Sequence, residues 1–139
     1  MPFLAPLSLT FAAGVVGGLI NSLAVWLCGL QGLNQALGVQ LAPALTPAFL
    51  YPRLVWGGLW GWLFLIPWGQ GWRWRQGLLF SLAPSAVQLL YIFPHRLHKG
   101  FLGWDLGLLT PLLVLIFNGI WGLATAFWLS LTTPRSRMF

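Results

Sequence analysis

Charged residues are scarce in this sequence, and acidic ones are nearly absent. Only 6% of the 139 residues are charged, and Asp105 is the single acid against seven lysines and arginines. Soluble domains carry about 25% charged residues, because water must wet their surface. A chain this poor in charge cannot be solvated by water along its length, so its solvent has to be lipid. The composition therefore predicts an integral protein of the lipid bilayer.

The same scarcity removes the usual ingredients of catalysis. A single acid cannot supply a carboxylate pair, and no nucleophile has a base placed beside it. The one cysteine, Cys28, excludes an internal disulfide and a cysteine-based metal cluster. His95 and His98 share a loop with Arg96 and Lys99, which lacks the further ligands that a metal needs. We predict no enzyme, no metal and no required cofactor, with a tetrapyrrole ligated by His95 or His98 as the remaining alternative.

The net charge of +6 does not indicate a nucleic-acid partner. The cations are scattered between apolar runs and form no continuous patch or binding motif. Cations and tryptophans at the ends of membrane helices commonly contact lipid headgroups. We assign this interface role to Arg53, Arg73, Arg75, Arg96, Lys99, Trp72 and Trp74.

Apolar residues make up 58% of the chain, and the mean hydropathy is +0.82. About 20 consecutive apolar residues cross the hydrocarbon core of a bilayer as a helix. Membrane strands would alternate apolar and polar residues, whereas these runs are apolar all round. We expect one all-α domain over residues 1–139. Its four transmembrane helices are predicted at about 10–30, 54–68, 77–94 and 104–131.

The connection between the first two runs has a pattern of its own. Polar or small residues recur at helical spacing on one side, with leucines on the opposite side. The first set is Gln31, Asn34, Gln35 and Gly38, and the second is Leu30, Leu33, Leu37 and Leu41. This spacing predicts a short amphipathic helix lying in the membrane interface over about residues 31–41.

Three amide side chains fall near the middle of predicted spans. These are Asn21, Gln88 and Asn118, and Ser85 lies one helical turn before Gln88. An unpaired amide in hydrocarbon costs several kcal/mol, so we expect these side chains to face one another or a wet cavity. They form either polar contacts that hold the bundle together or a midplane site for a ligand or permeant.

Small residues on the same helices predict where the helices touch. Glycine lets two membrane helices approach closely, so that their backbones come into contact. The expected packing positions are Gly14, Gly18, Gly57, Gly61 and Gly122.

The sequence also contains a faint internal echo. Leu45-Thr46-Pro47 is followed by Trp60-Gly61, and Leu109-Thr110-Pro111 is followed by Trp121-Gly122. Duplication of a helical hairpin, with both halves in the same orientation, would produce this pattern. Chance matching in so biased a composition is the alternative.

Basic residues set the expected orientation. With four spans, more cations share the side of both chain termini than lie on the other side, which favours cytoplasmic termini. The first group is Arg73, Arg75, Arg135 and Arg137, and the second is Arg53, Arg96 and Lys99.

Two segments resemble a known family. The run WRQGLLFSLAPSAVQLLYIFP at residues 74–94 and the run GVVGGLINSLAVW at residues 14–26 resemble the uncharacterised bacterial four-helix inner-membrane proteins of the YagU type. The resemblance implies four helices and a bacterial membrane, inner or of the intracytoplasmic or thylakoid type. It transfers no activity.

A chain without reactive groups, whose apolar helices are rich in tryptophan and glycine, is expected to work through contact. The leading prediction is a non-enzymatic accessory or scaffolding subunit of a larger bacterial membrane complex, with other subunits or copies of itself as partners. One alternative is a small oligomeric transporter or channel that uses the amide-lined midplane. Another is a protein that binds a pigment or quinone, because mid-span tryptophans can stack on such rings.

Overall fold

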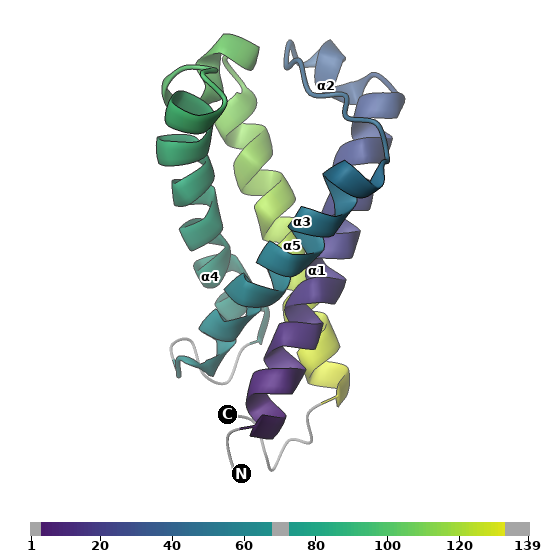
Figure 1. Ribbon diagram of the computed structural model, residues 1–139, viewed down its shortest axis with the longest axis vertical. Coiled ribbons are helices and arrows are strands. Elements are labelled where there is room, and N and C mark those ends of the chain that lie inside the picture. The colour runs from purple at the N-terminus through teal and green to yellow at the C-terminus, as the bar shows by residue number, and fades with distance from the viewer. Residues whose placement is uncertain (1–3, 68–72, 133–139) are drawn as a thin grey trace.

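The computed structural model describes residues 4–67 and 73–132, and both ranges are predominantly helical. No strand occurs in these ranges, which confirms the all-helical prediction. The elements, shown in Figure 1, are α1 (Leu4–Leu30), α2 (Leu33–Ala36), α3 (Pro47–Gly61), the 3₁₀ helix η1 (Trp62–Leu65), α4 (Arg73–Val87), the π-helix η2 (Gln88–Arg96), the 3₁₀ helix η3 (Phe101–Leu106) and α5 (Thr110–Thr132).

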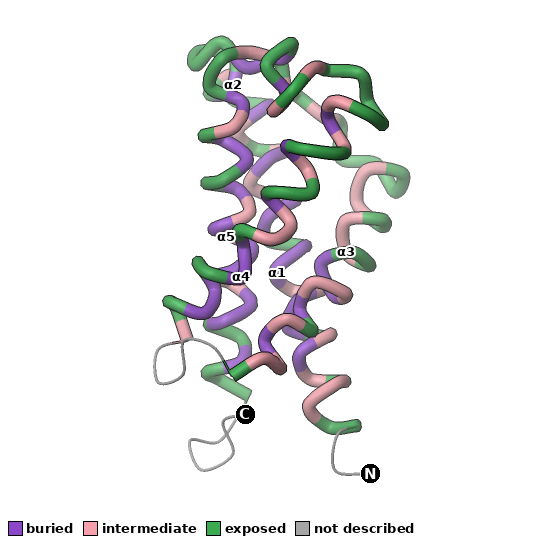
Figure 2. The backbone as a smooth tube through the Cα atoms, turned by 90° about the vertical axis from the view of Figure 1, so that its left-hand side faces the viewer, coloured by how far each residue is buried: buried purple, intermediate pink, exposed green. Residues whose placement is uncertain are grey.

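Three helices in the described ranges are long and apolar enough to cross a membrane. They are α1, the continuous Arg73–Arg96 helix formed by α4 and η2, and α5. Many of their large apolar residues are exposed, and exposed residues recur along each of the three helices (Figure 2). So many exposed large apolar residues are consistent with a lipid environment around these helices. The length, composition and surface are those of a multi-pass membrane protein.

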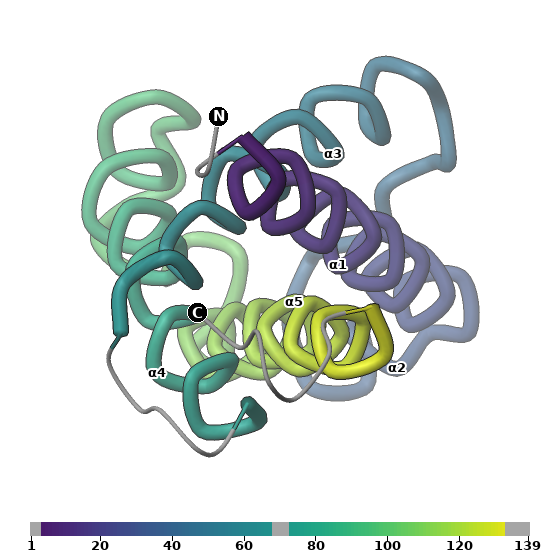
Figure 3. The backbone as a smooth tube through the Cα atoms, turned by 90° about the horizontal axis from the view of Figure 1, so that it is seen from below, coloured from purple at the N-terminus to yellow at the C-terminus, as the bar shows by residue number. Residues whose placement is uncertain are grey.

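The helices pack as two pairs joined by their inner members. α3 packs along α1, α4 packs along α5, and α1 contacts α5. Viewed from below, α1 lies between α3 and α5 (Figure 3). The α1–α3 pair and the α4–α5 pair diverge toward the end that carries α2 and η3 (Figure 1). α3 and α4 are therefore the outer members of the two pairs.

Glycines bring the two helices of each pair into backbone contact. In the α1–α3 pair, a Cβ atom on Gly61 would lie 3.0 Å from the Cα atom of Gly14, and one on Gly57 would lie 3.1 Å from the Cα atom of Gly18. In the α4–α5 pair, a Cβ atom on Gly122 would overlap the carbonyl group of Gly77. The absence of side chains at these positions allows the close packing of each pair.

The two copies of the internal echo occupy equivalent places in the two pairs. Thr46 caps α3, its hydroxyl accepting a hydrogen bond from the backbone N–H of Phe49 at 3.2 Å, and Pro47 is the first residue of that helix. Thr110 is the first residue of α5 and is followed by proline, but its buried hydroxyl has no hydrogen-bond partner among the described residues. Gly61 and Gly122, at the far end of the echo, each contact a glycine on the partner helix of their own pair.

The first connection differs from its prediction. Helix is confined to the four residues of α2, because Gly32 and Gly38 adopt positive φ angles of 80° and 77° and turn the chain at both ends. Asn34, expected on the polar side, is fully buried, and its Nδ2 atom donates to the carbonyl oxygen of Leu41 at 2.8 Å. Leu37, expected on the apolar side, is 40% exposed. The side chain of Asn34 therefore closes the loop instead of contacting water.

The last helix begins later than its predicted start at residue 104. Residues 101–106 form η3, and Gly107 follows in a conformation with φ 151° and ψ 153° that no α-helix contains. α5 then begins at Thr110, whose following proline favours the first turn of a helix. The first helix, in contrast, begins at Leu4 rather than near residue 10.

Candidate ligand-binding cavity

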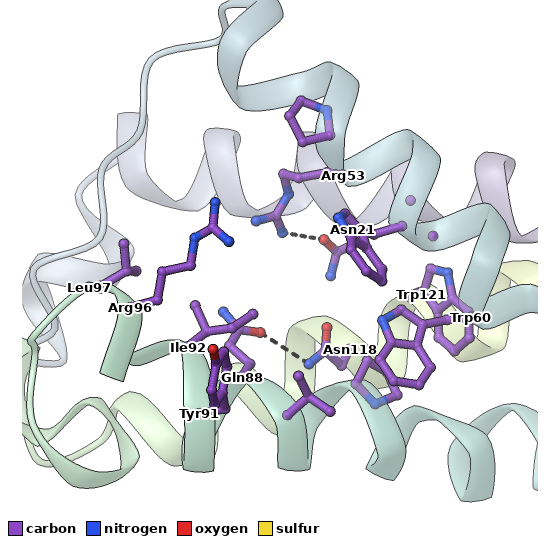
Figure 4. Close-up of a pocket in the computed structure, with 16 residues that line it drawn as sticks. Asn21, Arg53, Trp60, Gln88, Tyr91, Ile92, Arg96, Leu97, Asn118 and Trp121 are labelled. Carbon is purple, nitrogen blue, oxygen red and sulfur yellow. Dashed lines mark hydrogen bonds between the residues drawn. The ribbon is translucent and has the colours of Figure 1, made fainter. Parts of the chain in front are cut away.

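A partly open cavity of about 470 Å³ lies between the two helix pairs (Figure 4). Its lining comes from α1, α3, α4, η2 and α5, together with Leu97 just after η2. A second hollow of about 410 Å³ shares Arg53, Gln88, Leu97 and Asn118 with it and extends toward residues 40–43. We call the first of these the arginine cavity, because Arg53 and Arg96 both line it.

One wall of the arginine cavity carries Arg53, which α3 places against α1. The Nε atom of Arg53 donates to the hydroxyl of Ser22 at 3.0 Å, and its Nη2 atom donates to Oδ1 of Asn21. The Arg53 guanidinium also lies over the ring of Phe49, 4.8 Å from its centre. A Cβ atom on Gly18 would lie 2.8 Å from the carbonyl oxygen of Arg53, so the glycine is what lets this part of α3 reach α1.

Further bonds fix the partners of Arg53. Ser22 donates its own proton to the carbonyl oxygen of Gly18 at 2.6 Å, which leaves the hydroxyl oxygen facing Arg53. The Nδ2 atom of Asn21 donates to the carbonyl oxygen of Phe117 on α5 at 2.6 Å, so its Oδ1 atom faces Arg53. Arg53 is thus held by acceptors that are themselves held by α1 and α5.

The opposite wall carries a second polar group. The Nδ2 atom of Asn118 donates to the hydroxyl of Ser85 at 3.0 Å and to Oε1 of Gln88 at 3.3 Å. Ser85 in turn donates to the carbonyl oxygen of Ser81 at 2.8 Å. Gln88 is the first residue of the π-helix η2. Stretches of π-helix are rare and occur frequently at functional sites.

The predicted midplane cluster is therefore divided between two walls. Ser85, Gln88 and Asn118 lie together, whereas Asn21 pairs with Arg53. Arg53, assigned from the sequence to the lipid headgroups, bonds to Asn21 in this structure, because α3 begins at Pro47 and carries Arg53 alongside α1. The sequence signal that was missed is the spacing of Arg53 four residues before Gly57, on the side of α3 that meets α1.

The other assigned interface residues differ among themselves. Arg96 is exposed at the end of η2, and its guanidinium points into the cavity toward Arg53 (Figure 4). Arg73 is half-buried, and its Nη1 atom donates to Oε1 of Gln76 at 2.8 Å. The Arg75 guanidinium lies 5.5 Å from the ring centre of Trp74. Lys99 is exposed, while Trp72, Arg135 and Arg137 lie outside the described residues.

Aromatic side chains complete the lining. Trp121 is buried, and its Nε1 atom donates to the carbonyl oxygen of Gly14 at 3.2 Å. Trp60 and Trp56 line the same cavity from α3, and Tyr91 lines it from η2. Tyr91 also contacts His95, with 5.8 Å between the ring centres. Within the described residues, no group of three or more His, Cys, Asp or Glu side chains could hold a metal ion.

The Ser85–Gln88–Asn118 group provides a first testable prediction. Asn118→Leu should lower the free energy of unfolding by about 1 kcal/mol, since hydrogen bonds inside membranes average below 2. Adding Gln88→Leu to the Asn118→Leu variant should lower the free energy of unfolding by less than Gln88→Leu does alone, because the two side chains share one hydrogen bond. Steric trapping in bicelles measures all three variants. Thr125→Val is the matched control for additivity with Gln88→Leu, because Thr125 bonds only to the Trp121 carbonyl oxygen. A fully additive Asn118–Gln88 pair would contradict the contact.

The chemistry of the cavity is that of binding. It offers guanidinium and amide donors together with indole and phenol rings, and none of the described residues that line it is acidic. No family model, curated protein or solved structure matches this chain. The function has to be argued from the cavity itself.

Proposed function

We propose that this chain is a non-enzymatic membrane protein that binds a small ligand in the arginine cavity and moves it, as a small transporter does. The observation that carries the proposal is Arg53, a cation that Asn21 and Ser22 fix at the wall of the arginine cavity. Packing alone does not need a charge at this place. A binding site does.

The free-energy cost of placing this charge in the membrane depends on the depth of Arg53 in the bilayer. α1 has 27 residues and is therefore about 40 Å long, while a hydrocarbon core is about 30 Å thick. Asn21 lies about 13 Å short of the end of α1 at Leu30. If α1 is centred in the bilayer, the Arg53 guanidinium lies within the core. At the centre of a membrane helix an arginine costs about 2.5–3.5 kcal/mol on insertion scales, and arginines within the core mark ligand or ion pathways.

The position of the cavity between the helix pairs also supports transport. In many transporters the substrate lies at the interface of two structural repeats, which rock against each other. Here the interface lies between pairs that begin α3 and α5 with the same Thr-Pro step. Trp60 and Trp121, equivalent residues of the echo, both line the cavity. We take the echo to mark two repeats in parallel orientation.

Four transmembrane helices are part of the proposal. α3 has 15 residues and runs directly into the four residues of η1, which gives a helical length of about 30 Å. That length matches the hydrocarbon core. In Figure 1, α1 and α4 begin at the end where α5 stops, and α2 and η3 lie at the other. We place the termini in the cytoplasm on the cation count, and the protein in a bacterial inner membrane on the YagU-type resemblance.

The four-span topology predicts the outcome of site-directed labelling. In a Cys28→Ser background, single cysteines at Gln70 and Ser136 should react with a membrane-impermeant maleimide from the cytoplasm, and one at Leu97 from the opposite side. The reason is that two spans separate Gln70 from Ser136, whereas one span separates Leu97 from each of them. Labelling of Gln70 and Leu97 from the same side would contradict the four-span topology, because only the Arg73–Arg96 helix separates them.

Purification in mild detergent followed by native mass spectrometry tests the binding function. We expect a small molecule to stay bound to the protein, and the same compound to enter liposomes that contain this protein alone. Val87→Trp should displace the ligand, because Val87 lines the cavity. Val55→Trp is the matched control, since Val55 is exposed on α3 away from the cavity lining. Asn118→Leu gives a second blocking variant that removes a polar group instead of filling space.

The competing hypotheses predict different results in the same experiment. An accessory subunit would be recovered with a stoichiometric partner protein and without any small molecule. A pigment- or quinone-binding protein would show absorbance of the bound compound and no flux. Either outcome would contradict the transporter proposal.

A further inference from the structure

We infer that the ligand of the arginine cavity carries a phosphate group, which Arg53 and Arg96 bind together. The inference deepens the proposed function, since it names the chemistry of the ligand that the cavity takes. Arg53 comes from α3 and Arg96 from the end of η2, so the two cations belong to different helix pairs; both line the cavity, and the Arg96 guanidinium points toward Arg53 (Figure 4).

Hydrogen bonds orient the Arg53 guanidinium but do not use all of its N–H donors. A guanidinium has five N–H donors in a planar fork, and it accepts no hydrogen bonds. Within the described residues, Ser22 and Asn21 accept from Nε and Nη2, and no protein acceptor is bonded to Nη1. Two acceptors on α1 thus hold the plane of the guanidinium while part of its donor fork stays available. This is the preorganisation that a bidentate oxyanion site needs.

The charge in the cavity is not balanced by the protein. Arg53 and Arg96 bring two positive charges to one space, and no described lining residue carries a negative charge. Asp105, the single acid of the chain, is exposed on η3 and is not part of the lining. Like charges that line one cavity repel each other. A bound phosphate would remove this repulsion and accept hydrogen bonds from both guanidiniums.

The remaining lining suits a phosphate attached to an apolar body. Trp56 on α3 and Tyr91 on η2 line the cavity and are 59% and 60% exposed, so they form its open edge toward the surrounding lipid. A phospholipid headgroup could lie between the arginines while its chains remain outside among the lipids. Inorganic phosphate would use the same donors without the aromatic edge.

Binding of defined probes to the full-length protein in mild detergent tests the inference. The probes are dihexanoyl phosphatidic acid, dihexanoylglycerol, which has the same chains without the phosphate, and inorganic phosphate. We expect phosphatidic acid to bind at least about tenfold more tightly than dihexanoylglycerol, as measured by native mass spectrometry. Displacement of phosphatidic acid by millimolar phosphate would identify the free anion as a sufficient ligand. Binding that resists phosphate would identify the lipid as the source.

Charge-neutralising variants locate the site. Arg96→Gln should weaken phosphatidic acid binding about tenfold, which is the loss of one charge-assisted interaction. Arg53→Gln should weaken it further. Lys99→Gln is the matched control, because Lys99 is exposed close to Arg96 in the chain and does not line the cavity. If Arg53→Gln fails to fold, Arg96→Gln carries the test alone, since Arg96 is exposed at the end of its helix.

Equal binding of phosphatidic acid and dihexanoylglycerol would overturn the inference, and so would an equal loss of affinity in Arg96→Gln and Lys99→Gln. The proposed function fails separately. A retained ligand without phosphate, displaced by Val87→Trp but unaffected by Arg96→Gln, would leave the transporter proposal standing and refute the phosphate. Absence of any retained small molecule, together with no binding of the probes, would refute both.

Discussion

Gly122→Ala should lower the free energy of unfolding by about 2–3 kcal/mol, even though it adds a single methyl group. The new Cβ atom would overlap the carbonyl oxygen of Gly77 and lie 3.2 Å from its Cα atom. All of these are backbone atoms, which cannot rotate away as a side chain does. α4 and α5 would have to separate along their shared contact, and the Ser85–Gln88–Asn118 group near it would be strained. Titration with sodium dodecyl sulfate, followed by tryptophan fluorescence, measures the change.

Gly119→Ala is the matched control for this prediction. Gly119 lies on the same helix and is also buried, but a Cβ atom there would meet only Cδ2 of Leu78 at 3.7 Å, an ordinary contact. Because alanine is the better helix former, this change should be neutral or stabilise the protein by about 0.5 kcal/mol. Similar losses from Gly119→Ala and Gly122→Ala would show that α4 and α5 do not approach as closely as described.

The second large effect is expected at the pair Asn21 and Arg53. Asn21→Leu should lower the free energy of unfolding by about 2 kcal/mol, because it removes the acceptor of Arg53 Nη2 and the donor to the Phe117 carbonyl oxygen, and leaves Ser22 as the remaining side-chain acceptor described for Arg53. Arg53→Met should cost less, since it removes the charge together with its bonds. The double variant should therefore be more stable than the sum of the single losses predicts, by about 1 kcal/mol or more.

The control for this cycle is Arg75→Met, which removes the same charge from an exposed position at the start of α4. Combined with Asn21→Leu, it should give strictly additive losses. Steric trapping measures both cycles under the same conditions. Additivity of Asn21→Leu with Arg53→Met would mean that the two side chains do not interact. It would then contradict the statement that Asn21 fixes Arg53 at the wall of the arginine cavity.

The class of the protein and its helical nature follow from composition. A chain with 6% charged and 58% apolar residues has the composition of a protein solvated by lipid. In lipid, every backbone N–H and C=O group must form its hydrogen bond within a helix or a closed barrel. The three long helices were located from hydropathy to within a few residues, apart from the two starts noted above. These features depend on the composition and hydropathy summed over many residues, and both can be read directly from the sequence.

The short elements depended on single residues and were predicted less well. Between the first two runs, the spacing of polar residues indicated an amphipathic helix over 31–41, but positive φ angles at Gly32 and Gly38 confine helix to α2. Asn34 then finds its hydrogen bond within the loop. A helical pattern of side chains cannot reveal that the backbone turns at a glycine, because glycine permits both conformations.

The sequence by itself determined that the polar side chains near the middle of the helices need partners, since an unpaired amide in hydrocarbon costs several kcal/mol. Only the tertiary structure decided which partners they have. Close contact of Gly18 with α3 brings Asn21 within hydrogen-bond distance of Arg53. Packing of Gly77 on Gly122 brings Asn118 within hydrogen-bond distance of Ser85 and Gln88. A charge that the sequence placed among the lipid headgroups thereby becomes the centre of the candidate site. The physical reason is that pairing between helices depends on their rotation and depth relative to each other, and these are fixed by backbone contacts between residues far apart in the chain.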